Sequence, residues 1–97
     1  METEDRRRSY RKLVVKAIEY SILPSKTQET FDGVIATINE SGICLLTTKH
    51  LTNGQKIAIK DNDYLSEKTA TVRWSHQYDK YFYKVCLRFS ERVNLNK

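Results

Sequence analysis

The alternation of hydrophobic and polar residues is the clearest pattern along this chain, and it is typical of β-strands. In residues 69–76, Ala70, Val72 and Trp74 fall on one face and polar side chains on the other. Residues 81–89 repeat the pattern, with an apolar face made of Tyr83, Val85, Leu87 and Phe89. The polar connection between the two segments is short enough for a hairpin, so these strands are predicted to pair.

Six strands are predicted in total, at residues 13–22, 31–38, 43–48, 55–60, 69–76 and 81–89. Turn signals separate them, most clearly the segment 39–42 and Asn53-Gly54. No segment keeps the 3.6-residue period of a helix. The pattern therefore predicts an all-β protein, a small six-stranded antiparallel barrel whose closure removes exposed edges. We expect a flexible basic arm at residues 1–12, the barrel at residues 13–90 and a short polar tail at residues 91–97.

Length and composition are those of one small globular domain. The chain has 97 residues, of which 39% are hydrophobic and 30% are charged. No apolar run approaches the roughly 18 residues of a membrane helix, and the N-terminal residues do not resemble a signal peptide. Cys44 and Cys86 each lie within an apolar strand pattern, so we expect free buried thiols in a cytoplasmic protein.

Positive charge is concentrated near the N-terminus. Residues 6–12 carry five of the Lys and Arg side chains and no acidic one, within a chain of net charge +5. Arginine forms bidentate hydrogen bonds with phosphate and with the guanine edge, and it can stack on a base. The segment therefore indicates a clamp for a phosphorylated or nucleic-acid ligand, although a solvated basic tail is the plain alternative.

Catalysis and metal binding are poorly supported. His50 and His76 are isolated in the sequence, and neither cysteine has a partner at the spacing of metal ligands. We therefore expect no enzyme activity, no catalytic residues, no cofactor and no metal site.

Several segments, in order, resemble the PilZ domain, a bacterial receptor module for cyclic di-GMP. The family opens with RRxxxR, which matches Arg6-Arg7-Arg8-Ser9-Tyr10-Arg11. Later family patterns are similar to Asn53-Gly54, to Ala70-Thr71-Val72-Arg73-Trp74 and to the segment 83–89, where Cys86 replaces a glycine. The resemblance covers nearly the whole chain.

The second family motif, (D/N)xSxxG, fits this chain in two registers. If Gly42 is the family glycine, Thr37 replaces the acid or amide and Asn39 replaces the serine. If Asn39 and Ser41 are the first two fixed positions, Cys44 replaces the glycine. The first register is preferred because it keeps glycine at the turn, where its conformational freedom is useful.

The resemblance implies a two-sided clamp around cyclic di-GMP. Arg7 and Arg11, with Arg6 and Arg8 beside them, would grip phosphates and guanine, and ordering of the arm would signal to a downstream protein. The barrel surface would meet the ligand through Thr37, Asn39, Ser41 and Gly42. Trp74 is a further candidate for stacking on the ligand. It lies two residues after Val72, however, and regular alternation would put both on the face that packs in the core.

Two alternatives remain open beside a cyclic di-GMP receptor in the bacterial cytoplasm. One is a PilZ-like scaffold that has lost the nucleotide and acts through protein contacts, which the replaced motif residues Thr37 and Asn39 favour. The other is a general nucleic-acid binder, which the pI of about 9.3 suggests. Nucleic acid is the less favoured partner, because the barrel sequence shows no aromatic stripe interleaved with basic residues. The nearest approach to such a stripe, which edge packing explains as well, is Tyr78, Tyr81 and Tyr83 near Lys80 and Lys84. No membrane partner is expected.

Overall fold

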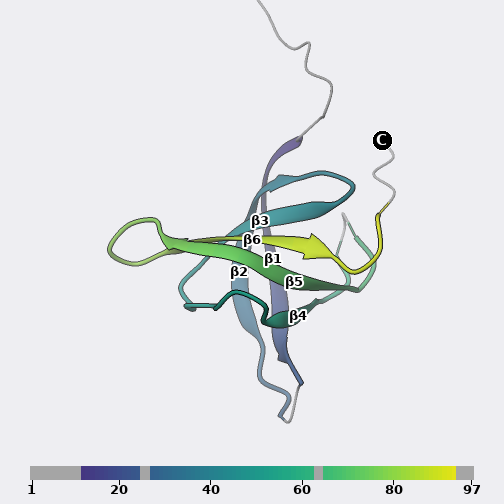
Figure 1. Cartoon of the computed structure of the whole chain (residues 1–97), viewed down its shortest axis with the longest axis horizontal. Coiled ribbons are helices and arrows are strands. Elements are labelled where there is room, and N and C mark those ends of the chain that lie inside the picture. Colours follow the sequence, from purple (N-terminus) through teal and green to yellow (C-terminus); the bar gives the residue numbers. More distant parts are fainter. Residues whose placement is uncertain (1–11, 25–26, 63–64, 94–97) are drawn as a thin grey trace, which may run out of the picture.

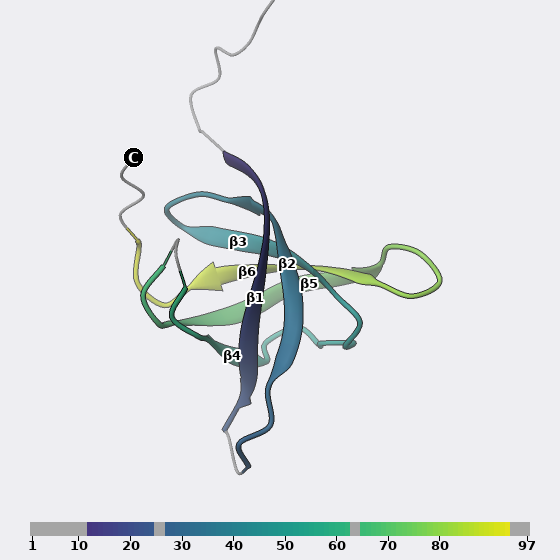
Figure 2. The same ribbon diagram turned by 180° about the vertical axis from the view of Figure 1, so that it is seen from behind.

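The structure, a computed structural model, describes residues 12–24, 27–62 and 65–93, with side chains from residue 16 onward. It contains six strands: β1 (Lys12–Leu23), β2 (Phe31–Ile38), β3 (Gly42–Thr47), β4 (Lys56–Ile59), β5 (Lys68–Gln77) and β6 (Tyr83–Phe89). Every pairing is antiparallel, and the order β1-β2-β3-β6-β5-β4 closes into a barrel (Figures 1 and 2). The predicted fold class is confirmed. The predicted mobility of the arm lies outside the described residues.

The interior of the barrel is filled by one side-chain set from each strand. Ile35 of β2, Leu45 of β3 and Val85 of β6 are all fully buried, as period-two alternation requires. Ile57 and Ile59 fill the same interior from the short strand β4. Leu51 and Leu65 lie in connecting segments and Val93 follows β6, and all three are buried against the core as well. The side chains between these core positions therefore lie on the outer surface of the barrel.

One buried polar pair ties the first three strands together. The Tyr20 hydroxyl lies 2.8 Å from Thr47 Oγ1, and Thr47 donates to the Asp32 carbonyl at 2.9 Å. Since the single hydroxyl hydrogen of Thr47 is used there, Tyr20 is the donor to Thr47. Burial raises the pKa of Tyr20 above its ordinary value of 10.0, and the nearby Asp32 charge acts in the same direction.

The alternation of β5 is broken once, and this break corrects the prediction for Trp74. The register of the β5–β6 ladder shifts between Val72 and Trp74, so Arg73 is an extra residue in a β-bulge. Val72 is buried, whereas Trp74 is 39% exposed. The predicted core position of Trp74 is therefore wrong, because parity from Val72 fails across the bulge.

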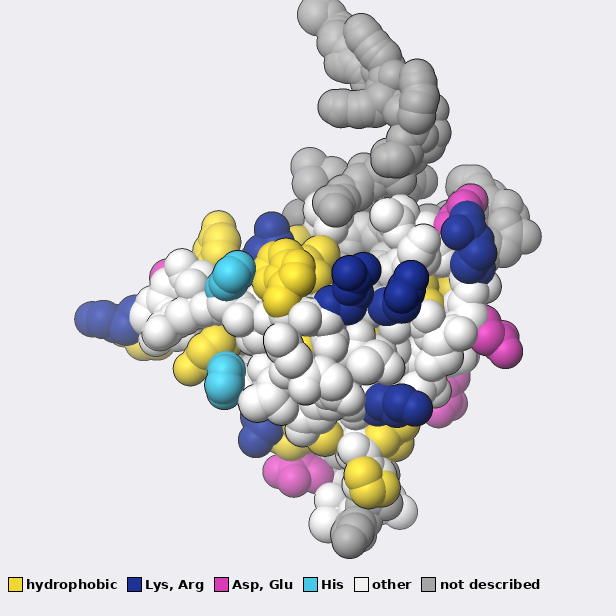
Figure 3. All heavy atoms as spheres, in the orientation of Figure 1, with side chains coloured by type: hydrophobic (Ala, Val, Ile, Leu, Met, Phe, Trp, Pro, Cys, Tyr) yellow, Lys and Arg dark blue, Asp and Glu magenta, His cyan; other side chains and the backbone are white. Residues whose placement is uncertain are grey.

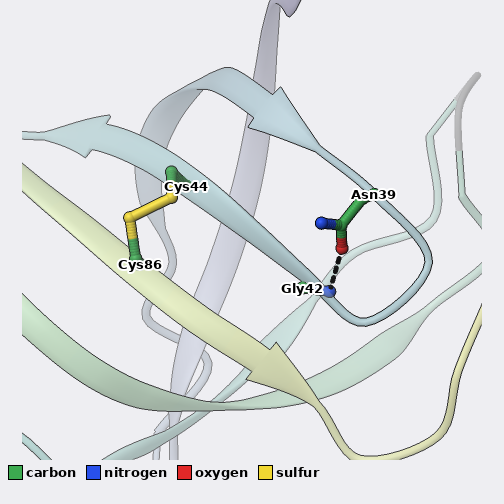
Figure 4. The surroundings of a disulfide bond; sticks show 4 residues. All are labelled: Asn39, Gly42, Cys44 and Cys86. Carbon is green, nitrogen blue, oxygen red and sulfur yellow. Dashed lines mark hydrogen bonds between the residues drawn. A yellow bond between two sulfur atoms is a disulfide. The ribbon is translucent and has the colours of Figure 1, made fainter. Parts of the chain in front are cut away.

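The predicted free thiols are also corrected. Cys44 and Cys86 form a disulfide that joins β3 to β6, and they lie directly opposite each other in that ladder (Figure 4). Their separation of 42 residues gives no hint of this pairing. Only the strand order, in which β6 returns to lie beside β3, brings the two cysteines together.

Candidate functional site

A hollow of about 360 Å³ lies on the outer face of the barrel, across β3, β6 and β5 and the turn after β2. This volume is within the range of small-molecule sites. Its lining combines polar, basic and aromatic side chains with the disulfide: Thr37, Asn39, Ser41, Gly42, Ile43, Cys44, Arg73, Trp74, Cys86, Leu87 and Arg88. The predicted barrel-surface residues, including both registers of the second motif, thus lie around one cavity.

One cross-strand row runs through the hollow. Thr37 of β2 pairs with Cys44 of β3, which pairs with Cys86 of β6, which pairs with Trp74 of β5. The disulfide therefore lies between a hydroxyl side chain on one side and an indole on the other. Each cysteine is only 9% exposed, whereas Trp74 remains accessible.

The bulge in β5 supplies two neighbouring side chains to the hollow. Arg73 and Trp74 are both exposed, although they are consecutive residues of a strand. A regular strand would send them to opposite faces, and a bulge is the ordinary means of redirecting a side chain. Arg88 of β6 completes the basic side of the hollow, and within the described residues neither Arg73 nor Arg88 forms an ion pair. Two accessible guanidinium groups therefore lie beside an accessible indole.

Asn39 holds the turn between β2 and β3. Its Oδ1 accepts a hydrogen bond from the backbone N–H of Ser41 at 2.8 Å. It accepts a second one from the N–H of Gly42 at 2.9 Å, which Figure 4 shows. This is an Asx-type turn, in which a side chain replaces a backbone acceptor. The amide oxygen is thus used by the fold, and the Nδ2 group remains as a donor for a ligand.

Gly42 is required for strand packing. A Cβ atom at this position would lie 2.3 Å from the Leu87 carbonyl oxygen of β6. No real side chain tolerates such a contact with a backbone atom, so β3 and β6 can approach only with glycine here. From the sequence, this glycine was expected to let a ligand approach the backbone. The structure supplies a packing reason for it.

The basic arm joins the barrel beside this hollow. Arg6, Arg7, Arg8 and Arg11 lie outside the described residues. Lys12, the first described residue, pairs with Ile38, and Leu13 pairs with Thr37. The arm therefore begins at the strand position next to the turn that Asn39 closes.

Sequence reasoning missed two arginines and the disulfide as parts of the hollow. Arg73 and Arg88 do alternate with core residues in the sequence, so their outward direction was a readable signal. Their proximity was not readable, because it depends on the pairing of β5 with β6. Figure 3 shows hydrophobic side chains beside histidine and basic side chains on this face of the molecule.

Other kinds of site are not seen in the described part of the chain. Among those residues, no group of three or more His, Cys, Asp or Glu side chains could hold a metal ion. No helix formed by them is long and apolar enough to cross a membrane.

Comparisons with known proteins give no relative: no family model, no curated protein and no solved structure matches the chain. The resemblance to the PilZ domain therefore rests on the motifs quoted above. What the fold and site define is a closed six-stranded antiparallel barrel with a basic, aromatic hollow on its outer face.

Proposed function

We propose that this protein binds cyclic di-GMP in the outer hollow of the barrel. The observation that carries the proposal is the gathering of the second-motif residues with two arginines and an exposed tryptophan around one cavity. A cyclic dinucleotide offers two phosphates, two guanine edges and two base faces. Arg73 and Arg88 supply bidentate donors, and Trp74 supplies a stacking surface.

The basic arm would close over the ligand from the adjacent strand end. Lys12 pairs with Ile38, next to the turn that lines the hollow, and Arg11 precedes Lys12 in the sequence. Arg7 is four residues further along, and an extended chain spans about 3.3–3.6 Å per residue. Both side chains can therefore reach phosphates in the hollow. Ordering of the arm would then be the signal that a downstream protein receives.

Binding is expected to be weaker than with an acidic residue at position 37. Thr37 lacks the carboxylate that could accept two hydrogen bonds from guanine. The loss of a charge-assisted hydrogen bond of this kind costs about 1.5–3 kcal/mol, or roughly ten- to a hundredfold in affinity.

The test is a calorimetric titration with cyclic di-GMP, followed by chemical-shift mapping. Binding should produce shifts at Thr37, Asn39 and Trp74, and Arg7→Ala, Arg11→Ala and Arg73→Ala should each weaken it. Thr37→Asp should strengthen binding. Lys60→Ala is the matched control, because this exposed cation follows β4, outside the strands that line the hollow. Cyclic di-AMP should bind more weakly, because guanine contacts supply the preference.

A ligand-independent scaffold is the second candidate. It is favoured by Asn39, whose Oδ1 already serves the turn and is not available to a ligand. No chemical-shift change near the hollow at millimolar cyclic di-GMP would overturn the receptor proposal and support the scaffold.

The receptor proposal places the protein in the bacterial cytoplasm, with no cofactor and no catalytic role. The Cys44–Cys86 disulfide argues against this location and gives an independent test of it. Stable disulfides are typical of oxidising compartments, and cytosolic thiols are kept reduced. Alkylation of Cys44 and Cys86 in intact cells, read by mass spectrometry, should therefore show two thiols if the protein works in the cytoplasm.

A further inference from the structure

Aromatic side chains continue along β5 beyond the hollow. Trp74 and His76 occupy alternate positions of β5 after the bulge, so they project from the same outer face, and Tyr78 directly follows the last residue of the strand. All three are exposed, Trp74 by 39% and Tyr78 by 61%. The rings of Trp74 and His76 already lie in contact, with centroids 4.6 Å apart. Exposed rings therefore continue along the chain from the hollow to the turn of the β5–β6 hairpin.

The hairpin tip adds further exposed rings. Tyr81 is 67% exposed and Phe82 is 37% exposed, and the Phe82 carbonyl accepts a hydrogen bond from the Tyr78 N–H. Figures 1 and 2 show that this hairpin projects beyond the body of the barrel. We call β5, β6 and the hairpin turn between them the β5–β6 ribbon. Every large hydrophobic side chain that is exposed among the described residues belongs to this ribbon and is aromatic. An aliphatic docking face is therefore not what the ribbon presents.

Cations accompany the rings. Residues 68–89 contain five Lys or Arg side chains and a single acidic one, Asp79. Lys84 of β6 lies directly opposite His76, and Lys80 lies at the tip. The Asp79 carboxylate is used by the turn, where it accepts hydrogen bonds from the Tyr81 and Phe82 N–H groups at 2.8 and 2.9 Å. Five cations against one carboxylate leave residues 68–89 with a net positive charge.

The cyclic dinucleotide site does not account for this ribbon. His76, Tyr78, Lys80 and Phe82 do not line the hollow. Trp74 and Tyr78 are about 13 Å apart along an extended chain, at roughly 3.3 Å per residue. A linear ligand with repeated base faces and phosphates matches this length, and it matches the exposed rings and the cations beside them.

We propose that the β5–β6 ribbon, from Arg88 and Arg73 to Lys80, binds single-stranded nucleic acid. Bases stack on Trp74, His76 and Tyr78, and the backbone phosphates follow the cations beside them. This is the combination that single-strand binders use, and it tolerates any sequence because every base has a ring face. The row of exposed rings was not predicted from the sequence, because regular alternation from Val72 put Trp74, its first ring, in the core.

The test is fluorescence anisotropy of a labelled oligonucleotide of about ten nucleotides with the full chain, over a range of salt concentrations. The oligonucleotide should bind and quench Trp74. Tyr78→Ala should weaken binding roughly five- to a hundredfold, since stacking contributes about 1–3 kcal/mol per base. Lys84→Ala should lower the salt slope by about 0.7, the value for one phosphate of a single strand, and Lys60→Ala should leave it unchanged.

Specific results would overturn the proposal. These are unchanged binding by Tyr78→Ala, equal affinity for duplex DNA, or binding of anionic vesicles but not of oligonucleotides. Tyr78 lies outside the hollow, so Tyr78→Ala should leave cyclic di-GMP binding intact. A chain that binds oligonucleotides but not cyclic di-GMP therefore supports the ribbon while removing the receptor function.

Discussion

At the scale of single residues, the best-matched positions of the second motif prove to be structural as well. Asn39 closes the turn through its amide oxygen, and Gly42 permits the contact between β3 and β6. Their presence in the sequence is therefore explained without a ligand. Arg73 and Trp74 differ from them, because the bulge in β5 leaves both side chains exposed beside the hollow.

Gly42→Ala should destabilise the protein by about 2–3 kcal/mol, because the new methyl group would overlap the Leu87 carbonyl oxygen. Urea unfolding measures this loss. Gly33→Ala is the matched control, since its Cβ would meet nothing closer than 3.4 Å, and it should change stability by less than about 1 kcal/mol. Equal effects of the two substitutions would contradict the packing role of Gly42.

Tyr20→Phe should cost about 1 kcal/mol at neutral pH, because the hydrogen bond to Thr47 is lost. The pH dependence should differ as well. The pKa of Tyr20 is raised in the folded state, so the unfolded chain loses this proton first, as pH rises above 10. The stability of the native protein then falls with pH, by up to about 1.4 kcal/mol per unit, until the folded pKa is passed.

Urea midpoints between pH 9 and 11 measure this alkaline loss. The Tyr20→Phe variant should lose less stability than the native protein over that range, since position 20 no longer titrates. Identical slopes for the two proteins would show that Tyr20 is not the responsible group.

At the scale of elements, alternation was sufficient to predict the strands but not their irregularities. The six strands were found from the sequence with boundaries within two residues of those observed, because each contributes alternate side chains to one core. The bulge at Arg73 leaves no mark in the sequence, since Val72-Arg73-Trp74 reads as regular alternation. The composition of the hollow was therefore predictable from the turn residues but not from β5.

Deletion of Arg73 should preserve the fold. Val72 already pairs with Leu87 and Trp74 with Cys86, which are consecutive in β6, so removal of the extra residue yields a regular ladder. Trp74 should remain exposed, with unchanged emission. Deletion of Thr71, from the regular part of the same strand, should be strongly destabilising, because a one-residue slip reverses the faces of its neighbours. Thermal unfolding distinguishes the two deletions.

At the scale of the whole molecule, the closed barrel followed from the strand count and spacing, but its cross-link did not. Strand order is a property of the complete chain, and the meeting of Cys44 with Cys86 depends on β6 lying beside β3. No local pattern near either cysteine carries this information.

Reduction of the disulfide should lower the free energy of unfolding by about 4 kcal/mol, the loop-closure value for roughly 43 residues. Urea unfolding with and without dithiothreitol measures the difference. The double variant Cys44→Ser, Cys86→Ser should unfold at the same urea concentration under both conditions. A native protein indifferent to reductant would contradict the cross-link.

The disulfide also gives the two halves of the chain a second covalent connection. The first three strands and the last three form two halves, joined in sequence only by the segment between Thr47 and Lys56, whose residues are exposed apart from Leu51 and Gln55. Each half contains one cysteine of the pair. A single proteolytic cut in that segment would therefore release nothing. The nicked protein would remain one covalent molecule with two new chain ends, and only a reductant would turn the cut into a separation of its halves.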